Sequence, residues 1–207
     1  MTRIQPSKIV CVGRNYAKHA AELGNDVPAE PLIFLKPPSS LVFQGDDIVM
    51  PRGAGRVDYE GEIGVIIGKK TRNVRAADAW DHVQALIPVN DVTARELQRS
   101  DDQWTRAKGF DSFCPVGSAV RLADVDLDAL DVTTRVNGEV RQQGSAADMV
   151  FDIPAVVAYI SEIMTLEPGD LIATGTPDGI GPLQSGDEVV VEVGGVGSVS
   201  NRVVVGD

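Results

Sequence analysis

Short apolar runs of strand length recur along this chain and constrain its fold more than any other feature. Nine segments have the length and the β-branched composition of strands, and turn residues bound most of them. The segments are Ile9 to Val12, Leu32 to Leu35, Ile48 to Met50, Tyr59 to Ile67, Ala85 to Val89, Val132 to Val136, Leu171 to Ala173, Val189 to Val193 and Ser198 to Val205. No strand–helix–strand unit repeats, which argues against a doubly wound parallel sheet. The pattern predicts an α+β fold, mostly β, in the form of a roll.

Few segments favour helices. We predict helices over Ala17 to Leu23, Thr93 to about Ser100 and Ile153 to Met164. In the last of these, Asp152 suits the N-cap and Pro154 suits the first turn. The dipeptide Asn137-Gly138 predicts a tight hairpin turn between two strands.

Length and charge restrict the class of protein. The 207 residues suffice for one buried core, and no linker divides them, so we predict a single domain over residues 1–207. The net charge of −11 and the lack of a Lys/Arg cluster argue against a nucleic-acid partner. No stretch approaches the roughly 18 apolar residues of a membrane span, and the amino terminus lacks an apolar signal region, so we expect a cytoplasmic protein. Cys11 and Cys114 are expected to be free, buried thiols.

A pair of glutamates stands where a strand emerges from the core. Glu60 and Glu62 lie two positions apart, so their side chains share one face of the predicted strand. At a spacing of about 6.6 Å, two bare charges repel by about 2.5 kcal/mol at an effective dielectric of about 20. An isolated Glu-x-Glu is more often the wet face of an amphipathic strand. Here, however, an apolar run without alternation, Ile63 to Ile67, follows, which indicates a buried strand and favours a site that binds a cation.

A third carboxylate, Asp91, follows the apolar run that ends at Asn90. Taken alone, Asp91 is equally compatible with capping the helix predicted from Thr93. Together with Glu60 and Glu62 it would form an all-oxygen site, which suits Mg²⁺ or Mn²⁺, with Ca²⁺ also possible and Zn²⁺ less favoured.

Two further segments carry polar groups suited to catalysis or binding. His19 and Glu22 lie three residues apart on a predicted helix, so they share a face, and a carboxylate beside an imidazole orients it and raises its basicity. Most such pairs are surface contacts without function. The glycine-rich segment 174–182 lacks a Walker lysine, and its N–H groups could bind a carboxylate, although a plain connecting loop is the more common case.

The chain resembles the fumarylacetoacetate hydrolase family, specifically its short members that include acylpyruvate hydrolases and oxaloacetate decarboxylases. The resemblance spans nearly the whole chain and rests on seven segments. They are Cys11-Val12-Gly13-Arg14-Asn15-Tyr16, Phe34-Leu35-Lys36-Pro37, Asp58-Tyr59-Glu60-Gly61-Glu62, Asn90-Asp91-Val92-Thr93-Ala94-Arg95, Ala107-Lys108-Gly109-Phe110-Asp111, Asp148-Met149-Val150-Phe151 and Thr174-Gly175-Thr176-Pro177.

The resemblance implies a mixed β-sandwich roll, a homodimer, and Mg²⁺ or Mn²⁺ held by Glu60, Glu62 and Asp91. It also implies a lid over residues 14–27 that carries His19 and Glu22, and a catalytic Lys108. The residues it implies as substrate contacts are Arg14, Tyr16, Arg95, Gln98 and Thr176. From the resemblance we expect no extra amino-terminal domain of the kind found in larger family members, which argues against fumarylacetoacetate itself as the substrate.

A 2-oxo acid can chelate a divalent cation, and cleavage beside its keto group leaves an enolate that the cation stabilises. Because the His19–Glu22 pair can activate water, we expect hydrolysis of acylpyruvates such as acetylpyruvate or fumarylpyruvate to pyruvate and a carboxylic acid. The alternatives are decarboxylation or tautomerisation of oxaloacetate and isomerisation of 2-hydroxyhepta-2,4-diene-1,7-dioate. A non-enzymatic module stabilised by a metal is a further, less favoured reading.

Overall fold

Strands buried on both faces form the centre of the largest sheet. The computed structural model describes residues 4–206, and it orders this sheet as β2-β1-β13-β6-β7-β9-β3, with β10 paired to β7. Every residue of β6 is buried, and so is every residue of β7 except Gln84, as expected for strands covered on both sides. The strands are β1 (Ile9–Gly13), β2 (Leu32–Lys36), β3 (Leu41–Phe43), β6 (Gly61–Ile67), β7 (Val83–Asn90), β9 (Cys114–Val116), β10 (Val120–Arg121) and β13 (Leu171–Ala173).

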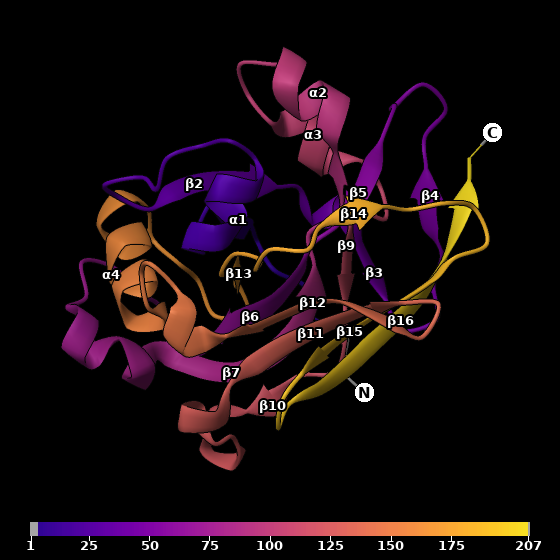
Figure 1. The fold of residues 1–207 in the computed structure, drawn as a ribbon. Coiled ribbons are helices and arrows are strands. Elements are labelled where there is room, and N and C mark those ends of the chain that lie inside the picture. Colours follow the sequence, from indigo (N-terminus) through magenta and orange to yellow (C-terminus); the bar gives the residue numbers. More distant parts are fainter. Residues whose placement is uncertain (1–3, 207) are drawn as a thin grey trace.

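A second sheet has the order β12-β11-β15-β16-β4, and its strands β11, β12 and β15 run across the lower part of Figure 1. Its strand β15 alternates, so that Val189, Val191 and Val193 are buried while the residues between them are more exposed. Asn137 and Gly138 both have positive φ, 52° and 82°, which confirms the predicted hairpin turn. The strands are β4 (Ile48–Met50), β11 (Asp131–Val136), β12 (Glu139–Ser145), β15 (Glu188–Val193) and β16 (Gly197–Val205).

The main core lies between these two sheets. Its buried side chains include Val65 of the large sheet, Val191 of the second sheet and Val156 of helix α4 (Ile153–Ile163). Asp152 caps α4, since its Oδ1 accepts a 2.8 Å hydrogen bond from the N–H of Ala155. The helix and its cap are as the sequence predicts, and the fold class is α+β with a β-rich core.

The remaining elements are short. A third sheet, in the order β14-β5-β8, consists of β14 (Gly181–Pro182), β5 (Val57–Tyr59) and β8 (Thr93–Ala94). The other α-helices are α1 (Ala17–Glu22), α2 (Arg95–Ser100) and α3 (Thr105–Gly109). The 3₁₀ helices are η1 (Pro38–Ser40), η2 (Ala76–His82), η3 (Leu122–Asp124), η4 (Leu127–Ala129) and η5 (Ala146–Asp148). None of the helices in residues 4–206 is long and apolar enough to cross a bilayer.

Two predicted elements differ from the structure. The strand predicted from Tyr59 to Ile67 is broken at Glu60, because β5 belongs to the third sheet and β6 to the largest. The helix predicted from Thr93 begins at Arg95, since Thr93 and Ala94 pair with β5 instead. We expected no signal region at the amino terminus. The first three residues of that segment, Met1 to Arg3, lie outside the described residues.

The break at Glu60 and the end of β7 bring the polar residues of several sequence motifs to one place. In Figure 1, α1 lies beside β2 and α2 packs with α3, all in the upper part of the view. The candidate site lies at the ends of the central strands β6 and β7, and residues of these helices line it.

Candidate active site

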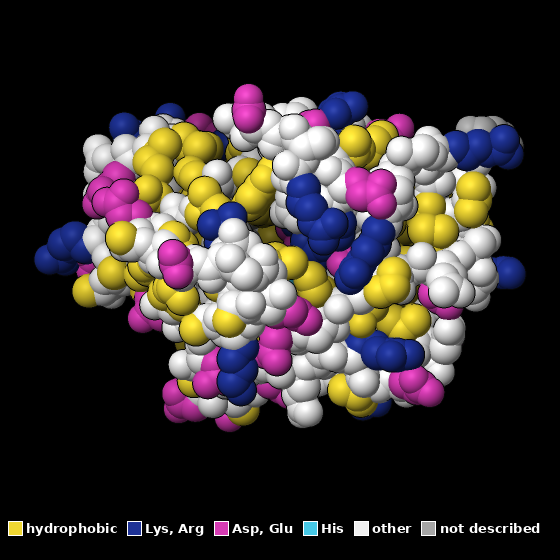
Figure 2. Space-filling view, turned by 45° about the horizontal axis from the view of Figure 1, so that its top comes forward, with side chains coloured by type: hydrophobic (Ala, Val, Ile, Leu, Met, Phe, Trp, Pro, Cys, Tyr) yellow, Lys and Arg dark blue, Asp and Glu magenta, His cyan; other side chains and the backbone are white. Residues whose placement is uncertain are grey.

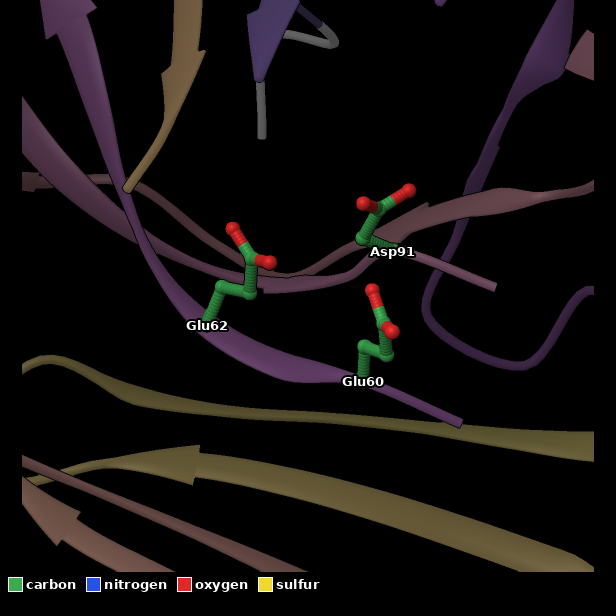
Figure 3. A group of neighbouring side chains, drawn as sticks. All are labelled: Glu60, Glu62 and Asp91. Carbon is green, nitrogen blue, oxygen red and sulfur yellow. The ribbon is translucent and has the colours of Figure 1, made fainter. Parts of the chain in front are cut away.

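Three buried carboxylates point into one space at the ends of β6 and β7. Glu60 stands at the junction of β5 and β6, Glu62 lies in β6, and Asp91 follows β7. One oxygen of each lies within 4.8 Å of the others, and Figure 3 shows the three side chains converging. Asp91 does not cap α2, which has no side-chain cap. The structure therefore brings together the three residues that the sequence proposed as metal ligands.

Side-chain amides hold the broken strand in place. The N–H of Glu60 donates to Oδ1 of Asn90 at 2.9 Å, and the N–H of Gly61 donates to Oε1 of Gln142 at 3.0 Å. The N–H of Asp91 donates to the carbonyl of Glu60 at 2.8 Å, which ties the two ligand segments together. These bonds replace regular pairing at the break, so the backbone can bend there without leaving buried N–H groups unpaired.

Three buried cations surround two of the carboxylates. Lys108 Nζ donates to Glu60 at 2.7 Å and to Asp91 at 2.6 Å, so it bridges them. Lys36 Nζ donates to the other oxygen of Asp91 at 2.6 Å. Arg95 binds Glu60 at 2.5 Å through NH2. No role was predicted for Lys36, although a lysine at the end of an apolar strand, when buried, needs a charged or polar partner.

Arg95 also donates from Nε to Asp58 at 2.8 Å, so Asp58 belongs to the same network. Counting buried charges, four carboxylates (Asp58, Glu60, Glu62 and Asp91) face three cations (Lys36, Arg95 and Lys108), which leaves one negative charge in excess. Arg56 pairs with Asp58 from a more exposed position and offsets part of that excess.

The excess falls on Glu62. Within the described chain Glu62 makes no ion pair, and its Oε2 accepts a 2.8 Å hydrogen bond from the N–H of Gly175. Burial, followed by the charges of Asp91 and Glu60, raises the pKa of Glu62 well above its usual range. Burial acts the same way on Glu60, but Arg95 and Lys108 outweigh it and hold the pKa of Glu60 far below its usual range.

The excess negative charge bears on whether a divalent cation fits the site. Three convergent carboxylate oxygens form a hard donor set, and Glu62 has no cationic partner in the described chain. A divalent cation would turn the excess of one negative charge into one positive charge with Glu62 ionised. The triad is therefore able to hold a divalent metal ion.

The triad forms the floor of a cavity of about 350 Å³. Six further residues that the sequence proposed for the site line this cavity. They are Arg14, His19, Arg95, Gln98, Lys108 and Thr176. Lining residues without a predicted role include the aromatic pair Phe34 and Trp104, whose ring centroids are 5.2 Å apart, and Arg99.

His19 is buried in the cavity wall and is held in its neutral form. Burial lowers the pKa of the imidazole below its usual 6.5, although nearby Glu60 opposes the shift. Its Nδ1 lies 3.5 Å from Oε2 of Glu22, too far for a good hydrogen bond, and has no hydrogen-bond partner in residues 4–206. Glu22 lies outside the cavity lining and accepts a 3.2 Å hydrogen bond from the N–H of Gly179. The pair expected from the sequence is thus adjacent, and its role in a lid stays a prediction.

Two other proposed contacts have mainly supporting positions. Tyr16 lies behind the cavity lining, where it is buried, pairs with Met149 through a β-bridge and leaves its hydroxyl without a partner in the described chain. Thr176 lines the cavity, but its hydroxyl donates to the carbonyl of Gly61 and accepts from Gln142, both at 2.8 Å. Thr176 and Gln142 together hold the backbone between the two glutamates.

The glycine-rich loop binds a carboxylate, as its N–H groups suggested, but the carboxylate is that of Glu62 rather than a ligand. Gly175 has φ of +106°, and a Cβ there would lie 2.7 Å from Cβ of Asn15. Only glycine fits this close approach, which fixes the N–H that faces Glu62.

The chain is similar over most of its length to known enzymes, which agrees with the presence of an active site at the carboxylate triad. The family model for the fumarylacetoacetate (FAA) hydrolase C-terminal domain matches residues 8–204. A mitochondrial oxaloacetate tautomerase of Arabidopsis thaliana is 46% identical over 200 residues, covering 94% of this chain and 90% of the relative. A mitochondrial oxaloacetate decarboxylase of Dictyostelium discoideum is 42% identical over 195 residues, covering 91% and 89%. The crystal structure of 2-hydroxyhepta-2,4-diene-1,7-dioate isomerase from Mycobacterium marinum matches with a TM-score of 0.89 at 46% identity, covering 98% of this chain and 76% of that chain.

Proposed function

The chain belongs to the fumarylacetoacetate hydrolase family, and we propose that it is a metal-dependent tautomerase that converts enol-oxaloacetate to its keto form. The observation that carries the proposal is the composition of the cavity. A carboxylate triad able to hold a divalent cation, the ammonium of Lys108 and a neutral imidazole all line one space of about 350 Å³.

Tautomerisation needs only proton transfer between C3 and the oxygen on C2, with negative charge developing on that oxygen. When bound at the triad, a divalent cation supplies positive charge at the oxo-acid end of the substrate. Lys108 lies against Glu60 and Asp91, so its ammonium adds a second positive charge at the same end. Asn90 and Gln142 hold the triad's backbone, so these charges are in place before substrate arrives.

His19 serves as the group that moves the proton. Because burial keeps the imidazole neutral near pH 7, one ring nitrogen is free to accept a proton. Nδ1 faces Glu22, which leaves Nε2 as the nitrogen for the substrate. Nε2 accepts the proton from the enol oxygen and delivers it to C3, and in the reverse reaction it carries the proton from C3 back to the oxygen.

The hydrolysis of acylpyruvates expected from the sequence has less support. Hydrolysis requires an additional bound water beside a distal carbonyl, whereas tautomerisation uses the groups already described. The relatives compared above are named as a tautomerase, a decarboxylase and an isomerase. Each of these reactions can proceed through an enol or enolate of an oxo-diacid.

The proposal is tested by following the ultraviolet absorbance of enol-oxaloacetate with purified protein, with and without Mn²⁺, while pyruvate release is measured in the same samples. We expect metal-dependent loss of the enol that outpaces pyruvate release. No acceleration over the metal blank, combined with cleavage of acetylpyruvate, would reject the proposal and restore hydrolysis. Pyruvate release as fast as enol loss would instead identify a decarboxylase.

A further inference from the structure

One face of helix α2 extends from the floor of the cavity to its mouth. Arg95, Gln98 and Arg99 are spaced i, i+3 and i+4, so they share a face of the helix, and all three line the cavity. Exposure increases along this series, because Arg95 is buried, Gln98 is half-buried and Arg99 is exposed. The helix thus presents one guanidinium at the floor and a second at the opening.

The two guanidinium groups have different partners. Arg95 is fully engaged with Asp58, Glu60 and Gln98. Arg99 forms no ion pair or hydrogen bond with any residue of the described chain, in contrast to other exposed arginines such as Arg106 and Arg121, which pair with nearby aspartates. An unpaired cation at the mouth of a cavity is notable in a chain of net charge −11. It is available to an anion from solution.

The surroundings favour an organic anion with a carbon chain. In Figure 2 the top of the molecule is turned toward the viewer, and Lys and Arg side chains gather near the middle of this view. Phe34 and Trp104 line the same cavity as Arg99 and provide an apolar wall. Such a wall suits the methylene carbons between two carboxylates better than it suits a strongly hydrated inorganic anion.

We propose that Arg99 binds the far carboxylate of a dicarboxylic 2-oxo acid, and that it thereby selects diacids over monoacids. The inference rests on the proposed function, in which the oxo-acid end of the substrate lies at the triad. A guanidinium suits this task, because its planar pair of N–H donors matches a carboxylate. Arg99 does not touch the reacting atoms, so it is a specificity residue.

The test compares two ligands of equal length that differ in the far carboxylate. Binding of 2-oxoglutarate and of 2-oxovalerate to the Mn²⁺-loaded protein is measured by calorimetry for the wild type, Arg99→Ala and Arg99→Lys. Arg121→Ala is the matched control, since it removes one exposed positive charge outside the cavity lining. We expect Arg99→Ala to weaken 2-oxoglutarate roughly tenfold, as for a charge-assisted hydrogen bond at a partly screened site, and to leave 2-oxovalerate and the control unchanged. Arg99→Lys should retain part of the affinity.

Equal loss for both ligands, no loss for 2-oxoglutarate, or an equal loss in Arg121→Ala would overturn the inference, as would failure of the wild type to bind 2-oxoglutarate. Enol-oxaloacetate turnover is measured on the same variants to separate this inference from the proposed function. A ligand-specific effect of Arg99 without any tautomerase activity would reject the function and keep the diacid site. Tautomerase activity with an unchanged KM in Arg99→Ala would keep the proposed function and reject the diacid site.

Discussion

Lys36 donates a 2.6 Å hydrogen bond to Asp91, and both side chains are almost completely buried. The ammonium thus compensates one carboxylate of the triad from the side away from Lys108, which binds the other oxygen of Asp91. This positive charge offsets the charge of a proposed metal ligand while the metal is absent, and substitution of Lys36 removes it separately from Lys108.

We expect Lys36→Met to destabilise the metal-free protein by about 3 kcal/mol, because it leaves one oxygen of Asp91 buried without its partner. Added Mn²⁺ should raise the melting temperature more in this variant than in the wild type, since the ion replaces the missing positive charge. Calorimetric melts with and without Mn²⁺ measure both effects. Lys70→Met, which breaks an exposed pair with Glu167, is the control. An equal Mn²⁺ response in both proteins would show that Lys36 does not balance the triad.

His19→Ala should separate two activities. If Nε2 of His19 moves the proton, the variant should lose roughly 10²- to 10⁴-fold in enol-oxaloacetate turnover, the usual range for a general base. Any decarboxylation of oxaloacetate should suffer less, because it needs only a chelated oxo acid and a stabilised enolate. Both rates are measured on one preparation with its metal content checked. Equal losses would assign His19 to substrate orientation or closure instead.

The pH profile tests the protonation state of the same residue. A base acts in its neutral form, and burial lowers the pKa of His19 below the usual 6.5, so protonation begins only at lower pH. The value of kcat/KM should therefore stay constant as the pH falls through 6.5 and should decline only at lower pH, where His19 becomes protonated. The measurement uses saturating Mn²⁺ at each pH from about 5 to 8. A decline centred at or above 6.5, or the same decline in His19→Ala, would contradict this assignment.

Gln142 provides a test of the strand break. Its side chain accepts from the N–H of Gly61 and donates to Thr176 and to the carbonyl of Pro177. We expect Gln142→Ala to cost about 1–3 kcal/mol of stability, because the buried N–H of Gly61 loses its partner. Mn²⁺ affinity should fall as well, since Gly61 separates the two glutamate ligands. The neighbouring exposed Gln143→Ala is the control for urea melts and metal titrations. Lost stability with unchanged Mn²⁺ affinity would limit Gln142 to folding.

The sequence predicted the elements that carry long patterns. Helix α4 has a cap, a proline in its first turn and an apolar face, and β7 is a long apolar run, so both were predicted within a few residues. Strands of two or three residues, such as β8 and β14, have no periodicity to detect. The break at Glu60 was missed because side chains from distant segments, not local turn residues, produce it.

The triad was predictable because like charges beside a buried strand have no ordinary structural explanation. Lys36 and Gln142 were not predictable in the same way. Lys36 meets Asp91 across 55 positions of sequence, and Gln142 meets Gly61 across 81. Local pattern carries no information about such pairings. The homodimer and the lid over residues 14–27, both implied by resemblance, stay predictions.

Calorimetric titration of Mn²⁺ into the wild type and Glu62→Gln tests whether Glu60, Glu62 and Asp91 bind a divalent cation. Glu62 is the most informative ligand, because it makes no ion pair in the described chain and its substitution removes the excess negative charge from the metal-free site. We expect one Mn²⁺ per chain in the wild type and an affinity at least about 100-fold lower in Glu62→Gln, with the metal-free variant as stable as the wild type or more so. Mn²⁺ binding of equal affinity in the two proteins would contradict this expectation.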